Sequence, residues 1–376
     1  MHSNVIDAQM SPLCFLPSGR LVCYSLGRVS VLEDGIVVMS VPVFNGMKER
    51  VLGRNRYLFR LLRLGVRASL ALNEEDVLMS AGNQIYELNL RSGNLSKGFY
   101  CGEGIRPLSF TNVEGLSDVD DGVYFGGYLG NMEKMPVSIY KRINVDDWIR
   151  VYTFPEGAIN HVHTILCDRY RDCLWIFTGD FDESSAIWKV TDNFMRVERV
   201  CYNNQKYRGC VTFALPEGLL YATDAPFADD SIYLMNPSDY STKAITSIDG
   251  SCIYGCQWKD KYVFSTTVEG DGRNTSLMEF IFGRRRGAGI KDDNVHMYCG
   301  NLNDGFKEIY KEKKDSMPYY TFQFGVFRFP YGLNNGDTLY FQPVATKYYD
   351  LNLMAIKSNN HDRLIPDHVL RNEDNR

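Results

Sequence analysis

The sequence NHVHTILCDRYRDCLWIFTGD, from Asn160 to Asp180, decides how the rest of the chain is interpreted. Its two apolar runs, 160–168 and 173–180, are separated by a short polar turn, which is typical of an antiparallel β-hairpin. Two histidines open the first predicted strand, and Asp180 follows the second. An antiparallel hairpin brings the start of one strand beside the end of the other, so His161, His163 and Asp180 are predicted to lie together.

Units of the same kind recur along the chain. Each has a mixed strand, a turn at Gly, Asp or Asn, a strongly apolar strand that ends in a small or acidic residue, and then further strands. The second strands end about 43 to 75 residues apart, which is the scale of four-stranded propeller blades with their loops. These ends lie near Gly27, Gly82, Tyr128, Asp180, Asp224, Thr267 and Phe341.

The repeats predict an all-β fold, a single β-propeller over residues 1–357. Seven four-stranded blades are the first interpretation. Six are the alternative, because the irregular segment 44–57 follows the first unit and the seventh unit, which begins at 320–322, shows only three strands. Residues 4–10 are expected to supply the missing strand and close the ring without an exposed sheet edge. The polar residues 358–376 are expected to form a disordered tail.

The composition fits a globular β-protein whose main partner is not nucleic acid. Among 376 residues there are 24 Tyr, 21 Phe and 32 Gly, which suit many short strands joined by turns. The net charge of −5 provides no broad basic surface for nucleic acid. The ten cysteines include no C-x-x-C pair and are interpreted as buried, reduced thiols.

Neither a membrane segment nor a signal peptide is predicted. The first ten residues lack a basic region and an apolar core, and no run of about 18 apolar residues occurs. A cytoplasmic location is therefore expected for the sequence as given. A secreted or periplasmic location is expected if a signal peptide has been removed.

Propeller geometry predicts that the site lies on one face. The inner strand of each blade starts at the face to which the loop between the second and third strands returns, so residues at both places converge on one mouth. The candidate catalytic residues are His161, His163, Tyr207 and Asp180. The candidate substrate-binding residues are Arg67, Arg106, Tyr128, Asn131, Gln205, Arg208 and Asp224.

These residue types suit an acidic sugar. Guanidinium groups bind carboxylates through two hydrogen bonds, and histidines beside a carboxylate can transfer protons near neutral pH. Simpler interpretations stay open: a hydrogen-bonded histidine pair, aspartates that cap turns, and arginines in ordinary ion pairs. No cofactor is certain, but a divalent metal held by His161, His163, Asp180 and Gln205 is a further alternative.

Part of the chain resembles the sialidase-like, BNR-repeat-type propellers found among bacterial glycan-processing and polysaccharide-cluster proteins. The resemblance covers about residues 100–240 and is carried by 124–128, 136–140, 161–163, 178–180, 205–208 and 222–224. It implies a propeller with a carbohydrate site at its mouth. The S-x-D-x-G-x-T-W boxes of true sialidases are degenerate or absent at 141–148 and 190–196, and no Tyr/Glu nucleophile pair is evident.

Together these observations predict a propeller that acts on a uronate- or sialate-containing oligosaccharide or polysaccharide, as a polysaccharide lyase or a glycosidase. Propeller lyases, a second relative by analogy, remove a proton beside a uronate carboxylate that Arg or a metal neutralises; His161, His163, Tyr207 and Arg208 match those roles by residue type. The alternative is a non-catalytic glycan-binding or protein-interaction propeller. The absence of a P-loop, a nucleophile elbow or an H-E-x-x-H motif favours it.

Overall fold

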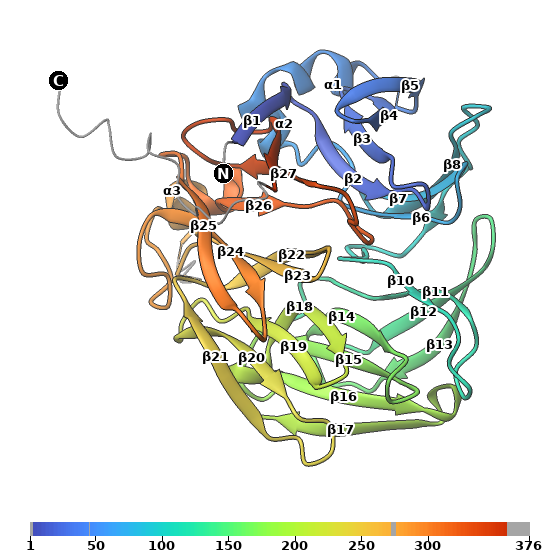
Figure 1. The fold of residues 1–376 in the computed structure, drawn as a ribbon, viewed down its shortest axis with the longest axis vertical. Helices are drawn as coiled ribbons and strands as arrows, with labels where there is room; N and C mark the ends of the chain where they lie inside the picture. The colour runs from blue at the N-terminus through green and yellow to red at the C-terminus, as the bar shows by residue number, and fades with distance from the viewer. Residues whose placement is uncertain (1–2, 45, 272–275, 359–376) are drawn as a thin grey trace.

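A computed structural model describes residues 3–44, 46–271 and 276–358, which form a seven-bladed β-propeller (Figure 1). Each blade is a four-stranded antiparallel sheet, and the blades follow one another round a central axis in chain order. The prediction of an all-β propeller with seven blades is confirmed, and the six-blade alternative is wrong.

The first four blades occupy the first half of the chain. Their strands are β2 (Ser11–Phe15), β3 (Leu21–Ser25), β4 (Arg28–Glu33) and β5 (Ile36–Pro42); β6 (Ala68–Ala71), β7 (Asp76–Ala81), β8 (Gln84–Asn89) and β9 (Phe99–Tyr100); β10 (Thr111–Val113), β11 (Gly122–Gly126), β12 (Val137–Asn144) and β13 (Asp147–Phe154); and β14 (His161–Asp168), β15 (Cys173–Gly179), β16 (Ala186–Thr191) and β17 (Arg196–Tyr202).

The remaining blades follow in the same way. Their strands are β18 (Gly209–Leu215), β19 (Gly218–Thr223), β20 (Asp230–Met235) and β21 (Thr242–Ile248); β22 (Cys252–Trp258), β23 (Lys261–Thr266), β24 (Asn294–Asn301) and β25 (Gly305–Lys313); and β26 (Val326–Arg328), β27 (Thr338–Val344), β28 (Leu353–Lys357) and β1 (Ser3–Asp7). The short helices are α1 (Met47–Arg50), η1 (Leu52–Arg54), α2 (Arg56–Leu61), η2 (Asp192–Phe194), η3 (Gln205–Tyr207), α3 (Leu277–Phe282) and α4 (Tyr319–Phe322).

The N-terminal strand closes the ring, as predicted. β1 pairs antiparallel with β28, with Ser3 opposite Ile356 and Val5 opposite Met354, so the last blade takes its outer strand from the other end of the chain. The first and last blades consequently lie side by side, drawn in blue and red in Figure 1. This pairing satisfies the backbone groups along the edge of β28.

The inner strand of the seventh blade lies further along the chain than predicted. Residues 320–322 belong to α4, and β26 is the inner strand. Pro318 immediately precedes α4, and the fixed φ of proline suits a helix start. Tyr320 of α4 stacks on Phe280 of α3. A Cβ at Gly325 would lie 3.0 Å from a methyl of Val295, so glycine permits the close packing that precedes β26.

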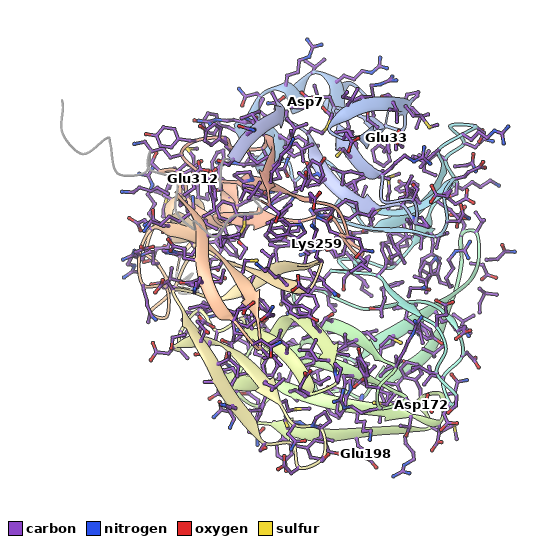
Figure 2. The ribbon with its side chains drawn as sticks, in the orientation of Figure 1. Asp7, Glu33, Asp172, Glu198, Lys259 and Glu312 are labelled. Carbon is purple, nitrogen blue, oxygen red and sulfur yellow. The ribbon has the colours of Figure 1, made fainter. Side chains whose placement is uncertain are left out.

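Apolar side chains fill the spaces between blades. The second strands β15 and β19 are buried along their whole length, because neighbouring strands and blades cover them on both sides. Trp175 and Tyr221 on these strands are fully buried, and each large apolar side chain stabilises the fold by about 1.5–3 kcal/mol. Charged residues such as Asp172 and Glu198 lie at the outer rim (Figure 2).

The expected tail, 358–376, lies outside the described residues except for Ser358. Within the described part of the chain, no helix combines the length and the apolar character needed to cross a membrane. All ten cysteines are free thiols, and most of them are buried.

A buried ion-pair network joins the connection between the first two blades to the seventh blade. The guanidinium of Arg60 in α2 is fully buried, with Nη2 2.7 Å from Asp315 Oδ2 and Nη1 2.9 Å from Asp350 Oδ2. Arg63 and Arg67 follow α2 along the chain. The network therefore fixes the point from which these two arginines approach the mouth.

Replacing Arg60 by alanine should destabilise the protein by about 3–5 kcal/mol, because two buried carboxylates would lose the guanidinium between them, which leaves Asp315 with Lys314 and Asp350 with the more distant Arg56. Arg20→Ala is the control. Arg20 forms an ion pair with Glu74 whose side chains are 33% and 41% exposed, and such pairs contribute about 0–1 kcal/mol. Equilibrium urea unfolding measures both variants, and equal losses for the two would contradict this interpretation.

Candidate functional site

The starts of several inner strands share a distortion. In β2, β14, β18 and β22 the register shifts by one residue near the strand start, which is a β-bulge. Bulges re-aim side chains and are common at barrel rims and beside active sites. The extra residues are Leu13, His163, Cys210 and Ile253. Two of them, His163 and Cys210, carry reactive side chains.

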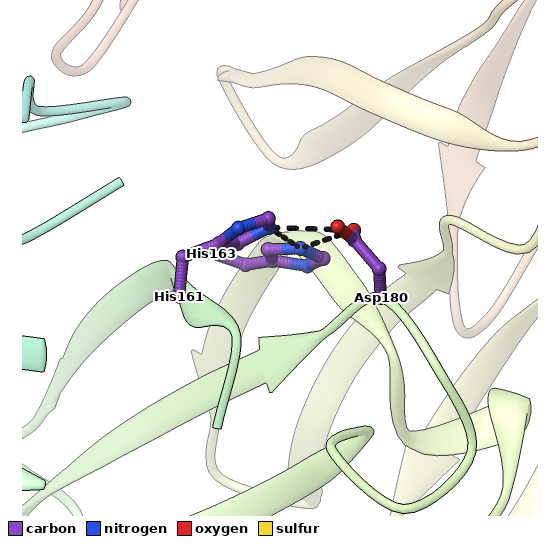
Figure 3. A group of neighbouring side chains, drawn as sticks. All are labelled: His161, His163 and Asp180. Carbon is purple, nitrogen blue, oxygen red and sulfur yellow. Dashed lines mark hydrogen bonds and ion pairs between the residues drawn. The ribbon is translucent and has the colours of Figure 1, made fainter. Parts of the chain in front are cut away.

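His161 and His163 of β14 meet Asp180, which directly follows β15 (Figure 3). The two Nε2 atoms are 3.0 Å apart, and they lie 3.3 Å and 3.5 Å from Asp180 Oδ1. Both histidines are buried, whereas the Asp180 side chain is 35% exposed. The structure thus brings together the three residues that the hairpin predicted as neighbours, and we call them the His–Asp cluster.

The loop after β11 sets the orientation of His161. Its Nδ1 lies 3.0 Å from the carbonyl oxygen of Leu129. A carbonyl can only accept, so Nδ1 carries a proton and donates it, and Nε2 is directed at His163 and Asp180. Asn131 and Asn160 each donate to the other's carbonyl, at 2.9 Å and 2.8 Å, and hold this loop against the start of β14. Asn131, a candidate substrate-binding residue, uses its amide in this internal pair.

Arg208, just before β18, joins Asp180 to Asp224 of the next blade. Its Nη1 donates to the Asp180 carbonyl at 2.7 Å, while Nη2 lies 3.0 Å from Asp180 Oδ1 and 3.3 Å from Asp224 Oδ2. Burial acts to lower the pKa of Arg208, but Asp224 and Asp180 raise it above its usual value. The Cys210 thiol donates to Asp224 at 3.4 Å. Burial and Asp224 raise the pKa of Cys210, so it is a poor nucleophile.

Opposed effects set the charges of the His–Asp cluster. Burial acts to raise the pKa of Asp180, but hydrogen bonds from His161 and His163 and the charge of Arg208 outweigh it and hold the pKa well below its usual value. Burial lowers the pKa of His163, and its contact with Asp180 offsets this only in part. Near neutral pH, Asp180 is therefore ionised and His163 is neutral.

Two other predicted site residues lie around the His–Asp cluster. Gln205 donates through Nε2 to the Asp180 carbonyl at 3.2 Å and to Asp182 Oδ1 at 2.8 Å, so it braces the loop that carries Asp180. Tyr207 packs against the hydrophobic cluster that includes Phe177 and Tyr221. The structure does not bring the Tyr207 side chain into contact with either histidine.

A second set of charges, which we call the arginine group, consists of Arg63, Arg67, Arg106 and Arg328. Arg67 directly precedes β6, Arg106 pairs through its backbone with Tyr128, and Arg328 ends β26. Arg67 and Arg328 line one small cavity together with Tyr254 and Tyr331. The group therefore gathers side chains from three separate chain segments: the α2–β6 connection, the residue that pairs with Tyr128, and the end of β26.

The arginine group has no carboxylate within 4.0 Å in the described part of the chain. Arg63 Nη2 instead donates to a backbone carbonyl, that of Tyr320, at 2.6 Å. Burial and then neighbouring arginines lower the pKa values of Arg63 and Arg67 to about 10. A downward shift of this origin indicates crowded positive charge that lacks a counter-charge. By contrast, Arg60 and Arg208 each contact two carboxylates.

Tyr128 connects the two charged sets. The Arg106 guanidinium lies 5.0 Å from the centroid of its ring, a cation–π distance, and the His161 ring centroid lies 4.1 Å away. Burial and then the charge of Asp180 raise the pKa of Tyr128 above its usual value, so the phenol is protonated near neutral pH. The mouth therefore has a cationic side and a histidine–carboxylate side, with a phenol between them.

A protonated carboxyl group lies near Arg208. Glu269 is 7% exposed and accepts hydrogen bonds from the hydroxyls of Ser251 and Thr267. Burial and then Asp224 raise the pKa of Glu269 to about 7. Near neutral pH, this group is consequently half protonated, while Asp180 is ionised. Carboxyl groups with separated pKa values are the usual pair for acid–base catalysis.

Three clusters in the described part of the chain have ligand atoms within 4.8 Å of one another and could hold a metal: His161 with His163 and Asp180, His163 with Cys210 and Asp224, and Asp249 with His296 and Glu308. The third joins Asp249, before β22, to His296 of β24 and Glu308 of β25 in the sixth blade. There Nδ1 and Nε2 of His296 face Glu308 and Asp292 respectively, which suits an imidazolium between two carboxylates better than a metal ligand.

A larger groove lies away from these residues. It has a volume of about 430 Å³ and is lined by residues before and within α2 together with the β27–β28 loop, including Arg54, Arg56, Tyr57 and Tyr349. None of its lining residues belongs to the His–Asp cluster or the arginine group. Its size shows space for a ligand, and its one lining carboxylate, Asp350, is already paired with Arg60.

Sequence reasoning missed Arg63, Arg328, Cys210 and Glu269. Arg328 was missed because the inner strand of the last blade was predicted at 320–322, whereas it lies at 326–328. Glu269 does carry a signal, because it lies two residues after the predicted end of a second strand, where the loops return to the mouth. Cys210 faces Asp224 because of a bulge, and alternation along a regular strand does not reveal one.

Comparison with known proteins supports the fold and gives no family. No protein-family model matches the sequence, and no curated protein matches it. The structure of a β-propeller domain of Cps50 (Swd1) from Myceliophteria thermophila is similar with a TM-score of 0.53 and 8% identity, covering 95% of this chain and 100% of that one. The structure of hydrazine synthase from Kuenenia stuttgartiensis is similar with a TM-score of 0.53 and 8% identity. The match covers 94% of this chain and 96% of the hydrazine synthase chain.

Dihydro-heme d1 dehydrogenase NirN is also similar, with 13% identity and a TM-score of 0.48, over 89% of this chain. This chain spans 60% of the length of the NirN chain. At 8% identity, the likeness to the Cps50 and hydrazine synthase structures shows a shared fold and nothing about substrate. The resemblance to sialidase-like propellers has no support from a family match.

Glu269→Gln should make stability less dependent on pH. The pKa of Glu269 is raised in the folded state. Its favourable contribution to folding stability is therefore complete below its pKa in the unfolded chain, near 4.5, and is lost as pH rises through its folded-state pKa of about 7. At pH 8 the free energy of unfolding of the variant should exceed that of the wild type by up to about 3 kcal/mol. At pH 5 this difference should vanish or reverse. Urea unfolding at both pH values measures it.

The matched control is Glu33→Gln, at an exposed position at the end of β4. The difference in free energy of unfolding between this variant and the wild type should be the same at both pH values. If the difference in free energy of unfolding between Glu269→Gln and the wild type were also the same at both pH values, Glu269 would not be a buried acid that titrates near neutral pH.

Proposed function

We propose that this propeller acts on a uronate-containing glycan at its mouth, as a polysaccharide lyase. The observation that carries the proposal is the arginine group, four cationic side chains without a carboxylate partner, beside Tyr128 and the His–Asp cluster. The earlier resemblance to sialidase-like, acidic-glycan propellers points in the same direction, towards an acidic sugar.

The arginine group is suited to the acid group of such a sugar. Bringing like charges together is unfavourable unless a ligand supplies the opposite charge, and a carboxylate matches the guanidinium fork geometrically. Arg67 and Arg328 line one small cavity of about 20 Å³, so their side chains lie close to each other. Neutralising a uronate carboxylate also acidifies the hydrogen on the adjacent carbon, which is the first requirement for elimination.

Tyr128 and His161 are the proton-transfer groups next to the arginine group. In the proposed elimination, one of them takes the proton from the carbon beside the carboxylate. The C–H electron pair forms a carbon–carbon double bond, and the bond from the next carbon to the glycosidic oxygen breaks. The leaving oxygen takes a proton from the protonated partner. The phenol of Tyr128 provides the acid for this step, and the hydrogen-bonded imidazole pair of His161 and His163 provides the base.

Glycoside hydrolysis is the second candidate, and Glu269 is the observation that favours it. A glycosidase needs one protonated and one ionised carboxyl group near the scissile bond. Glu269, with a pKa of about 7, and the ionised Asp180 have the required charge states. The two reactions leave different products, because only elimination creates an unsaturated sugar that absorbs ultraviolet light.

Arg67→Ala and Arg328→Ala should each lower kcat/KM on a uronate-containing polysaccharide by about 10- to 150-fold, the loss expected for one charge-assisted hydrogen bond. Arg91→Ala is the control, because the Arg91 side chain is 81% exposed and lies in the turn after β8. Product absorbance and reducing ends are followed together over a panel of uronate and sialate glycans.

New reducing ends without the ultraviolet absorbance of an unsaturated sugar would show that the reaction is hydrolysis and not elimination. Binding without either product would make the protein a glycan-binding propeller and overturn the catalytic proposal. Full activity in both mouth variants would show that the arginine group does not hold the acid group of the sugar.

A further inference from the structure

We propose that His161, His163 and Asp180 bind one divalent first-row transition metal ion at the mouth. The three ligand atoms come from two neighbouring strands of a single blade and point towards one another (Figure 3). Both imidazoles are buried in the rigid fourth blade, and the carboxylate is partly open to the mouth. Two histidines and one carboxylate on one side of an ion form a donor set that suits such metals.

The distances match those between metal ligands. With bonds of about 2.1 Å, ligand atoms are about 3.0 Å apart in octahedral coordination and about 3.4 Å apart in tetrahedral coordination. The separations of 3.0, 3.3 and 3.5 Å between the two Nε2 atoms and Asp180 Oδ1 fall around these values. One ion can therefore contact all three atoms with little movement of the side chains.

The orientation of His161 suits a metal ligand. Its Nδ1 donates to the Leu129 carbonyl, and its Nε2 is directed at His163 and Asp180 in the cluster. Metal-binding histidines commonly use the second ring nitrogen in this way, and the bond fixes the orientation of the ring. The loop that supplies the carbonyl is in turn held by the Asn131–Asn160 pair.

Gly179 makes room for this arrangement. A Cβ built at Gly179 would lie 2.6 Å from His163 Cε1 and 3.0 Å from Arg208 Cγ. Both contacts are too short, so any larger residue would push the imidazole or the arginine stem out of place. Gly179 and the bulge at His163 together bring the second imidazole close to the first.

Arg208 gives the competing explanation. It contacts Asp180 Oδ1 at 3.0 Å, and the cluster could be a closed ion-pair network that needs no metal. The geometry favours the metal, because three donor atoms, the two Nε2 atoms and Asp180 Oδ1, lie within 3.0–3.5 Å of one another.

The metal would have a defined place in the chemistry. Three protein ligands leave coordination positions open, and Tyr128 lies against His161, between the cluster and Arg106. Resting on the proposed function, the sugar carboxylate would then bridge the metal and the arginine group. With the ion bound, His161 would be a ligand and not the base, so the phenol of Tyr128 would give its proton to the leaving oxygen and a water molecule would take the proton from the carbon.

The test is metal binding by the full-length protein, without any glycan. Protein stripped with EDTA and dialysed is titrated calorimetrically with ZnCl2, MnCl2 and CaCl2, and bound metal is counted by elemental analysis. One Zn²⁺ per chain is expected, with Mn²⁺ weaker and Ca²⁺ not bound, because imidazole ligands favour the later first-row metals. No binding of Zn²⁺ or Mn²⁺ would overturn the proposal.

Variants locate the ion. His161→Ala, His163→Ala and Asp180→Asn should each weaken Zn²⁺ binding by about 100-fold or more, at the upper end of what supporting residues lose. Gly179→Ala should weaken it through the displaced His163. Gly130→Ala is the matched control, since a Cβ there meets nothing within 4 Å. His296→Ala tests the sixth-blade cluster, and loss of the ion in this variant alone would overturn the assignment.

Folding and function are separated by two further readouts. Circular dichroism and thermal unfolding show whether each variant is folded, and the visible spectrum of added Co²⁺ reports the ligand set directly. Metal binding without turnover would refute only the glycan reaction. Turnover that persists in EDTA, with no metal bound to the wild type, would refute only the metal site.

Discussion

The pairing of β1 with β28 is the constraint on which the mouth depends. Each blade packs only against its neighbours, so seven sheets hold a fixed circle only if the last is tied to the first. Once closed, the ring directs the starts of all seven inner strands to one face. Side chains as far apart in sequence as Arg63 and Arg328 then share one electrostatic environment.

Charge is unevenly balanced at this face. Arg60 and Arg208 use two carboxylates each and are satisfied within the protein. The arginine group has no carboxylate within 4.0 Å among the described residues; Arg67, Arg106 and Arg328 are partly buried, and Arg63 is exposed. A fold retains such an arrangement at a cost in stability, and sites of this kind are commonly functional. The opposite side, with ionised Asp180 and neutral His163, supplies groups that can move protons or hold a metal.

The sequence was sufficient for the repeat, its number of blades and the closure by the N-terminal strand. It also predicted the neighbours His161, His163 and Asp180, because hairpin pairing is local. Prediction from the sequence failed where tertiary contacts determine the local structure or the direction of a side chain. Tyr320 became helical beside Phe280, and this displaced the inner strand and concealed Arg328. The bulge that turns Cys210 towards Asp224 left no mark in the alternation of apolar residues.

Side-chain roles were the least predictable feature. Asn131, Gln205 and Tyr207 occupy positions that the blade rule assigns to the mouth, yet their polar or aromatic groups contact the protein itself. Only the coordinates distinguish a residue that faces a ligand from one that braces a loop. The same coordinates added Glu269, whose partners Ser251 and Thr267 lie on adjacent segments of the sixth blade.

The most direct test of the account compares two ligands that differ in one group. A uronate oligosaccharide and its carboxyl-reduced analogue, identical except for the acid, are titrated into the protein at several salt concentrations. Recognition by the arginine group predicts that the acid form binds at least about 100-fold more tightly, with an advantage that shrinks as salt rises. Equal affinity for the two oligosaccharides at low salt would contradict the claim that the mouth recognises an acidic sugar.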